Sequence, residues 1–366
     1  MKISRCDSFL LRMPLDRVVA DSQMTITHIE FVGVNIYTDD GIKGVGYTGT
    51  LGYGGSVIKE ALDSLLLPDL VGEDPFNVKE IWQKMSSGRG FLIGRTGAVM
   101  MAQSCVDVAL WDIIAKSLER PLWQVLGGSP DKMPCYSKDA QWLNSTIEET
   151  VDSVKAELDK GYVGVKVKIG RPNAEDDWER LRAVRKAVGD DVLLMTDVNQ
   201  KWDLNTAIYW GKRLEDLNLY WLEEPMPAAE VGAHKLLRER ISIPIALGES
   251  LFAPQAFKDY IVANAVDFVQ LQVIRMGGIT PWLEVAALAK AFNLRVCPHA
   301  GDSLQVHQHL IRAISNRGYL EGGEPLTQGI WKYPIKIEDG YCVAPTEPGA
   351  STEFNDSVFQ NYLVKN

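Results

Sequence analysis

Residues 192–225 read VLLMTDVNQKWDLNTAIYWGKRLEDLNLYWLEEP, and the architecture can be worked out from this stretch. An apolar run at 192–196 is followed by an amphipathic helical pattern at 204–217 and by a second apolar run at 220–222. Buried strands that alternate with amphipathic helices are typical of parallel sheets, because a parallel strand needs a crossover to return the chain. The stretch therefore predicts one strand–helix unit and the strand of the next unit.

The same alternation extends in both directions along the chain. The apolar runs that we interpret as strands lie at 133–136, 163–169, 192–196, 220–222, 244–247, 268–271, 294–297 and 319–320. Eight such units predict an α/β fold with a closed, TIM-type (β/α)8 barrel. An open doubly wound sheet is the alternative, but no GxGxxG motif follows the first strand.

The first third of the chain has a different order of elements. β-rich runs at 29–37 and 43–48 flank Asp39-Asp40-Gly41, a typical hairpin turn, and a helical pattern follows at 96–116. Strands followed by helices favour an α+β domain. We therefore divide the chain into an N-terminal α+β domain at 1–128, a barrel at 129–333 and a C-terminal tail at 334–366. The tail contains a predicted hairpin and is expected to return to the first domain.

Composition and charge narrow the class of protein. The 366 residues are 46% hydrophobic and 23% charged, close to the averages of soluble globular proteins. The chain has no run of 18 apolar residues to span a membrane, and its start lacks the apolar core of a signal peptide. The net charge of −10 disfavours nucleic acid and anionic membranes as partners. Since the 5 scattered cysteines include no CxxC pair, we expect reduced thiols and a cytoplasmic protein.

Three carboxylates stand at the ends of successive predicted strands. Asp197, Glu223 and Glu249 are spaced 26 residues apart, one strand–helix unit each. Because the C-terminal ends of barrel strands meet at one rim, the three side chains should converge there. Carboxylates held together repel one another unless a cation lies between them, and hard oxygen ligands suit Mg²⁺. The other interpretation is that each acid only caps the following helix or pairs with a surface lysine.

Three candidate bases lie at the ends of predicted strands. Lys166 and Lys168 are two residues apart on one strand, so they share a face. Burial and mutual repulsion at the barrel mouth should lower the pKa of a lysine, so that one can accept a proton while the other holds an anion. His299 ends the seventh strand, nearly opposite, and can approach a substrate from the other face. The alternatives are solvated lysines and a structural histidine.

Together, the motifs Lys-x-Lys, Asp-x-Asn, Glu-Glu-Pro, Gly-Glu-Ser, Gly-Gly-Ile-Thr and Pro-His resemble those of the enolase superfamily, mandelate racemase subgroup. Within that subgroup, the stretch at 197–203 and Gly44-Val45-Gly46-Tyr47 are similar to the galactarate/talarate dehydratase-like acid-sugar dehydratases. The resemblance covers nearly the whole chain. It implies a modified (β/α)8 barrel under a capping domain that is built from the N-terminal segment and the C-terminal tail.

The resemblance also implies roles for individual residues. The three acids hold one Mg²⁺ per active site, Lys168 is a base that Lys166 supports, and His299 lies on the opposite face. Family members hydrogen-bond the substrate carboxylate with a glutamate that corresponds to Glu321. The residues expected to contact the substrate are Gln23, Asn199, Gln272 and Glu321.

Two positions depart from the family pattern. Relatives pair the histidine with an aspartate after the sixth strand, where this chain has Gln272. A neutral amide can orient the imidazole ring but cannot stabilise its charged form as a carboxylate does. Asp302 is close in sequence and is the candidate substitute. Relatives of the galactarate type have a lysine where this chain has Asp21-Ser22-Gln23, so the site need not favour a diacid.

We predict a lyase, namely a Mg²⁺-dependent dehydratase of an acid sugar (an aldonate or aldarate). Removal of the proton α to the carboxylate gives a metal-stabilised enediolate, a chemistry of which enolase-superfamily sites are themselves an example. Loss of the β-hydroxyl then gives a 2-keto-3-deoxy sugar acid, with Lys168 as base and His299 as acid, or with the roles reversed for the other stereochemistry. The alternatives are a racemase, epimerase or cycloisomerase of a hydroxy acid, and a non-catalytic sugar-acid-binding homologue. The expected partners are a small anionic sugar acid and further copies of the chain, as a dimer or octamer.

Overall fold

The computed structural model describes residues 1–87, 89–139, 142–299, 304–323, 326–327 and 329–365. The chain begins with an antiparallel sheet of β1 (Ile3–Ala20), β2 (Thr25–Thr38) and β3 (Lys43–Thr50), in that order. The predicted hairpin is confirmed, since β2 pairs with β3 and Gly41 takes the positive φ of 82° that the turn requires. β1 lies outside the strands expected from sequence, because Pro14 and Asp16 interrupt its apolar pattern.

The helix α3 (Gly97–Ser117) packs against β3. The approach is close because β3 presents glycine, and a Cβ at Gly46 would collide with the backbone of Cys105 and Ala109. By length and composition α3 could cross a membrane, but most of it is buried within the protein, which is typical of a core helix. The other helical elements of this part are α1 (Gly55–Ala61), η1 (Leu62–Leu66), η2 (Leu67–Asp69), η3 (Pro75–Asn77), α2 (Val78–Ser87), η4 (Arg89–Leu92) and α4 (Leu122–Val125).

A parallel barrel follows, as predicted. Its strands are β4 (Met133–Ser137), β5 (Gly164–Lys168), β6 (Leu193–Asp197), β7 (Trp221–Glu223), β8 (Ile245–Leu247), β9 (Phe268–Val269), β10 (Arg295–Val296) and β11 (Leu320–Gly322). Successive strands pair in parallel from β4 to β10, and β11 pairs with β4. A bridge between Val296 and Arg317 closes the ring. Each strand lies where the apolar runs predicted it.

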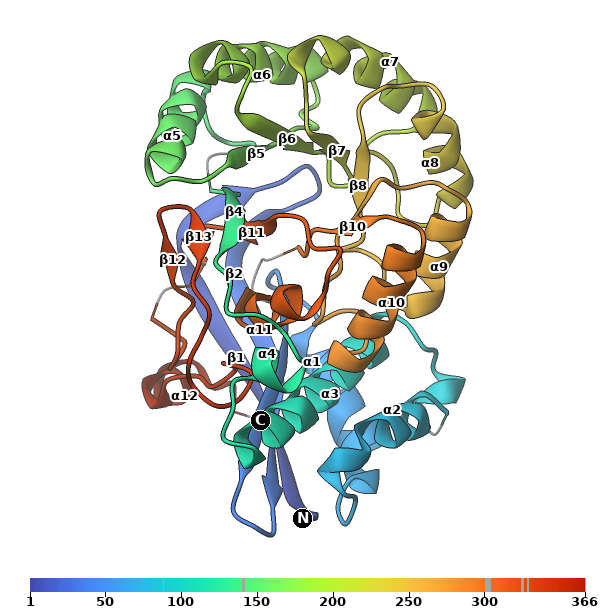
Figure 1. The fold of residues 1–366 in the computed structure, drawn as a ribbon, viewed down its shortest axis with the longest axis vertical. Helices are drawn as coiled ribbons and strands as arrows, with labels where there is room; N and C mark the ends of the chain where they lie inside the picture. Colours follow the sequence, from blue (N-terminus) through green and yellow to red (C-terminus); the bar gives the residue numbers. More distant parts are fainter. Residues whose placement is uncertain (88, 140–141, 300–303, 324–325, 328, 366) are drawn as a thin grey trace.

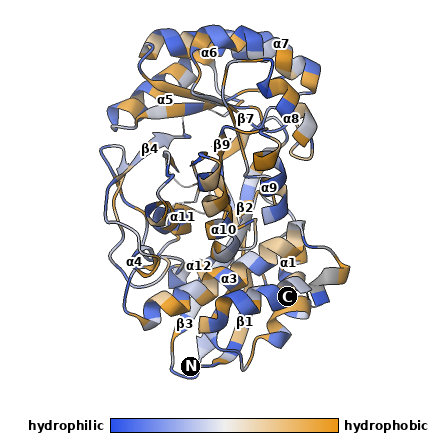
Figure 2. Ribbon diagram, turned by 45° about the vertical axis from the view of Figure 1, so that its right-hand side comes forward, coloured by the Kyte–Doolittle hydropathy of each residue, from blue (hydrophilic) through white to orange (hydrophobic). Residues whose placement is uncertain are grey.

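Helices form the outer layer of the barrel. In Figure 1, α5 to α9 describe an arc around the strands, and the N-terminal sheet lies below them. Figure 2 shows hydrophilic and hydrophobic residues alternating along α6 and α7, as expected for helices with one face on the core. Among the described residues the next helix after β11 is α12 (Asp356–Tyr362), which contacts β1 of the N-terminal sheet, so the barrel departs from a complete (β/α)8 pattern. The helices are α5 (Ile147–Asp159), α6 (Ala174–Val188), α7 (Leu204–Leu214), η5 (Glu215–Leu217), α8 (Val231–Arg238), α9 (Pro254–Val262), α10 (Ile279–Ala291), α11 (Leu304–Leu310) and η7 (Ile311–Ala313).

The C-terminal tail contacts both parts of the chain. Its hairpin, β12 (Ile337–Glu338) with β13 (Tyr341–Cys342), extends the barrel sheet because β13 pairs with β4. The tail then reaches the N-terminal sheet, where the Phe354 ring packs edge-on against Phe9 and Phe31, and α12 (Asp356–Tyr362) lies beside β1. The boundaries drawn at 128 and 333 stay predictions.

Candidate active site

The three predicted acids come together at the mouth of the barrel. Asp197 and Glu223 end β6 and β7, which pair in register at these residues, and Glu249 follows β8. One carboxylate oxygen from each lies within 4.8 Å of the others, and all three side chains are buried. A buried group of anions is unfavourable unless cations compensate it. Since the donors are hard carboxylate oxygens, the group fits a divalent cation such as Mg²⁺.

The three predicted bases lie directly against these acids. Lys168 Nζ is 2.7 Å from Asp197 Oδ2, and Lys166 Nζ is 2.8 Å from Glu223 Oε1. His299 Nε2 is 3.0 Å from Glu249 Oε2. The acids and bases that the sequence predicted separately therefore form one charged cluster.

The carboxylates decide the charge of the bases. Burial lowers the pKa of Lys166, but Glu223 and Glu321 outweigh it and hold that pKa well above its usual range. Burial also lowers the pKa of Lys168, but Asp197 and Glu249 together outweigh burial and the neighbouring Lys166, so this pKa is raised as well. Burial lowers the pKa of His299, but Glu249 and Glu321 together outweigh it and raise this pKa. The expected lowering of a lysine pKa is therefore wrong for this structure, since carboxylates rather than the neighbouring ammonium dominate.

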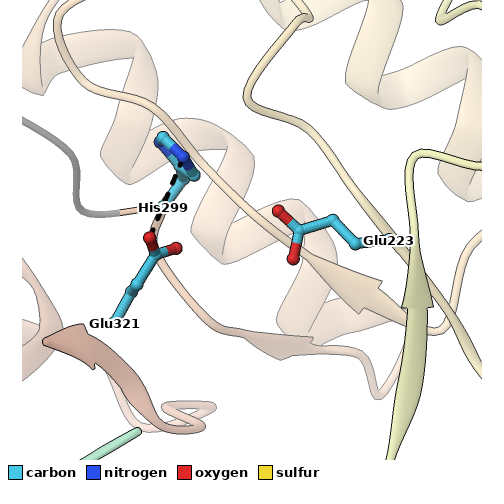
Figure 3. Close-up of side chains that lie close together, drawn as sticks. All are labelled: Glu223, His299 and Glu321. Carbon is cyan, nitrogen blue, oxygen red and sulfur yellow. Dashed lines mark ion pairs between the residues drawn. The ribbon is translucent and has the colours of Figure 1, made fainter. Parts of the chain in front are cut away.

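The side chain of Gln272 takes the place expected for the partner of the histidine. Its Nε2 is 2.9 Å from His299 Nδ1, and with the amide in this orientation Nδ1 accepts and the proton resides on Nε2. Figure 3 shows the His299 ring facing Glu321, whose Oε1 is 4.0 Å from Nε2, with Glu223 across the site. Asp302, the other candidate partner, lies outside the described residues.

The other residues expected at the substrate are also at the site. Asn199 Oδ1 accepts a hydrogen bond of 2.7 Å from Lys168, which orients that ammonium. Glu321 bonds Lys166 at 3.2 Å and the Tyr136 hydroxyl at 3.0 Å. Gln23 reaches in from the N-terminal domain, and its Nε2 donates to the backbone oxygen of Asn199 at 2.6 Å. The N-terminal domain is thus fastened to the rim of the barrel at β6.

One cavity joins the cluster to the N-terminal domain. It is lined by Lys166, Lys168, Glu249, His299 and the four residues expected to contact the substrate, while Asp197 and Glu223 lie buried beside it. The sequence analysis missed further polar residues of its lining, namely Lys138, Gln200, Glu224, Ser250 and Arg275. Lys138 directly follows β4, so the strand-end rule could have found it. Arg275 lies within a loop, where no spacing marks it.

The fold and the site together define the class: a TIM-type barrel enzyme with a carboxylate centre for a divalent metal and bases at the strand ends. Two family models match the chain. The N-terminal domain of mandelate racemase / muconate lactonizing enzymes matches residues 10–127, and the enolase C-terminal domain-like family matches residues 149–358. The chain therefore belongs to the enolase superfamily, as its motifs predicted.

One relative with a solved structure is a sugar-acid dehydratase. L-talarate/galactarate dehydratase of Salmonella typhimurium (strain LT2) is 35% identical over 328 residues, 88% of this chain and 80% of that protein. Its crystal structure with Mg and L-lyxarohydroxamate has a TM-score of 0.92 at 32% identity, covering 99% of this chain and 93% of that one.

Two further relatives differ in activity. Arabinonate dehydratase of Saccharolobus solfataricus is 33% identical over 345 residues, which cover 92% of this chain and 91% of that protein. The 3,6-anhydro-alpha-L-galactonate cycloisomerase of Streptomyces coelicolor is 33% identical over 353 residues, 95% of each chain. Membership of the superfamily therefore does not determine the reaction, which depends on the residues of the site.

Proposed function

We propose that this protein is a Mg²⁺-dependent acid-sugar dehydratase that converts an aldonate or aldarate to a 2-keto-3-deoxy sugar acid. The observation that carries the proposal is the convergence of Lys168, His299 and the three acids on one cavity. The dehydratases among the relatives support it.

The residues divide the chemistry between them. Asp197, Glu223 and Glu249 would hold Mg²⁺, whose positive charge stabilises the enediolate that forms when the weakly acidic α-proton leaves. Lys168 is the general base that removes this proton. Asp197 raises its pKa, so Mg²⁺ on that carboxylate would offset the negative charge and favour the neutral amine, while the hydrogen bond to Asn199 orients Nζ. The ammonium of Lys166 supplies a second positive charge for the substrate carboxylate.

The β-hydroxyl leaves as water only if a general acid protonates it, and His299 is the candidate acid on a different part of the barrel rim from Lys168. His299 comes from β10, separated from β5 by β4 and β11 in the ring, and its Nε2–H is the donor that the Gln272 contact favours. An amide partner stabilises the imidazolium less than an aspartate does, which favours proton donation over proton removal by this histidine. We therefore assign His299 as the general acid.

A cycloisomerase is the second candidate, because one relative has that activity and the first step, removal of an α-proton, would be the same. The two reactions differ in whether water is released.

The test is incubation of the protein with Mg²⁺ and a panel of aldonates and aldarates in D₂O, followed by NMR. The proposal expects a 2-keto-3-deoxy product that carries one solvent deuterium at C3. An isomer without loss of water would favour the cycloisomerase or an epimerase. If no compound reacts or exchanges, both enzyme assignments fail and a non-catalytic sugar-acid-binding protein is left.

A further inference from the structure

The side chain of Gln200 lies among the ends of three neighbouring strands. It follows β6, and its Nε2 donates to Ser250 Oγ at 2.8 Å, after β8, and to Glu224 Oε2 at 3.3 Å, after β7. Its Oε1 accepts from the backbone nitrogen of Ala228 at 2.7 Å. Both hydrogens of Nε2 thus have acceptors and Oε1 has a donor.

The backbone of Gln200 is held just as firmly. Its nitrogen donates to the backbone oxygen of Glu224 at 2.7 Å. Asn199 and Gln200 have φ of 48° and 64°, and Glu224 has φ of 38°, in the left-handed region that side-chain-bearing residues adopt rarely. Such conformations persist only where surrounding contacts hold them. The side-chain amide of Gln200 supplies such contacts for the loop after β6, to which it belongs, and for the loop after β7, where it bonds Glu224 and Ala228.

Two of the three side-chain partners of Gln200, Glu224 and Ser250, are next in sequence to a predicted metal ligand. Gln200 itself comes three residues after Asp197, Glu224 directly follows Glu223, and Ser250 directly follows Glu249. One side chain therefore connects the three loops from which the carboxylates project. Mg²⁺ requires near-octahedral geometry, so the relative placement of its ligands affects its affinity.

We infer that Gln200 is a positioning residue of the metal centre, which fixes the three carboxylate-bearing loops relative to one another. The inference rests on the metal site of the proposed function. A direct role in binding the substrate is less consistent with the structure, because the amide that lines the cavity is already saturated by Ser250, Glu224 and Ala228.

The test measures Mg²⁺ affinity of the full-length protein by isothermal titration calorimetry, together with thermal stability in EDTA. Residues that orient metal ligands typically change affinity by about 10–100-fold when they are removed. We expect Gln200→Ala to weaken Mg²⁺ binding by that factor. Ser250→Ala, which removes one of the two acceptors, should weaken it by less, and it keeps the inference testable if Gln200→Ala does not fold.

Gln103→Ala is the matched control. Gln103 is also a buried glutamine with two side-chain hydrogen bonds, to the Trp82 backbone oxygen at 3.1 Å and to Ser86 Oγ at 2.8 Å, but it lies in α3. Its loss should lower thermal stability and leave Mg²⁺ affinity within about twofold of the wild type, since it contacts none of the ligand loops.

Four results overturn the inference. It fails alone if Gln200→Ala binds Mg²⁺ like the wild type, or if Gln103→Ala weakens binding equally. It fails together with the metal assignment if the wild type binds no Mg²⁺, or binds it equally well after Asp197→Asn. If Gln200→Ala weakens Mg²⁺ binding, Gln103→Ala does not, and no sugar acid reacts, then the positioning role of Gln200 is supported and the proposed dehydratase reaction is wrong.

Discussion

Replacing Lys166 by methionine removes a buried positive charge while nearly keeping the shape of the side chain. The Lys166 ammonium lies 2.8 Å from Glu223 and 3.2 Å from Glu321, and all three side chains are at most 2% exposed. Removing one partner of a buried ion pair leaves the other charge uncompensated, which costs about 3–5 kcal/mol. For a chain of this length, such a loss lowers the melting temperature by about 4–7 °C.

Magnesium should reverse part of this loss. Without the ammonium, the acids attract a divalent cation more strongly, so Mg²⁺ should bind Lys166→Met more tightly and stabilise it more than it stabilises the wild type. Calorimetric melting of both proteins, in EDTA and in millimolar Mg²⁺, measures the two effects.

Lys84→Met is the matched control for this experiment. Lys84 also pairs with two carboxylates, at 2.9 Å and 3.0 Å, but it lies on the surface, where solvent screens such pairs and they contribute little to stability. Its melting temperature should change little and should not depend on Mg²⁺. Melting of Lys166→Met like the wild type in EDTA, or equal stabilisation of both proteins by Mg²⁺, would show that the Lys166 ammonium does not compensate the buried carboxylates.

Three more predictions follow from single contacts. Gln272→Asp places a negative charge beside His299 Nδ1 and should raise the pKa of the imidazole further, so the alkaline limb of the kcat–pH profile moves to higher pH; an unchanged limb would contradict His299 as the acid. Arg275, whose Nη1 donates to the Glu249 backbone oxygen at 3.1 Å, lines the cavity, and Arg275→Ala should raise KM for an anionic substrate by about 10–100-fold, with a smaller rise for Arg275→Lys. Burial raises the pKa of Asp107 from 3.8 to about 7, so the folded state binds this proton more tightly and loses stability as pH rises from about 4 to about 7. Asp107→Asn should therefore gain melting temperature relative to the wild type over that range, and a constant difference in calorimetry would speak against a titrating Asp107.

Much of the fold could be predicted because it is encoded by local patterns. The alternation of apolar runs and amphipathic stretches located the eight strands of the barrel, and the 26-residue spacing of Asp197, Glu223 and Glu249 brought three acids to one rim. Both signals depend only on the period of the backbone elements.

What could not be predicted depends on side-chain contacts between distant parts of the chain. The pairing of Lys168 with Asp197 determines the direction of its pKa shift, and the sequence shows only that Lys166 is two residues away. The role of Gln200 depends on Ser250, 50 residues later, and on a left-handed backbone that no glycine marks. Oligomeric state and cellular location stay predictions, because they depend on surfaces and partners outside a single chain.

The most direct test of the central claim, that Lys168 removes the α-proton and His299 protonates the leaving group, is solvent exchange at the α-carbon. A sugar acid that the wild type dehydrates is incubated in D₂O with Mg²⁺ and either Lys168→Ala or His299→Asn, and both exchange and product are followed by NMR. We expect His299→Asn still to exchange the α-hydrogen for deuterium but to form product at least about 100-fold more slowly. Lys168→Ala should do neither. Exchange by Lys168→Ala, with none by His299→Asn, would contradict the assignment of the two roles.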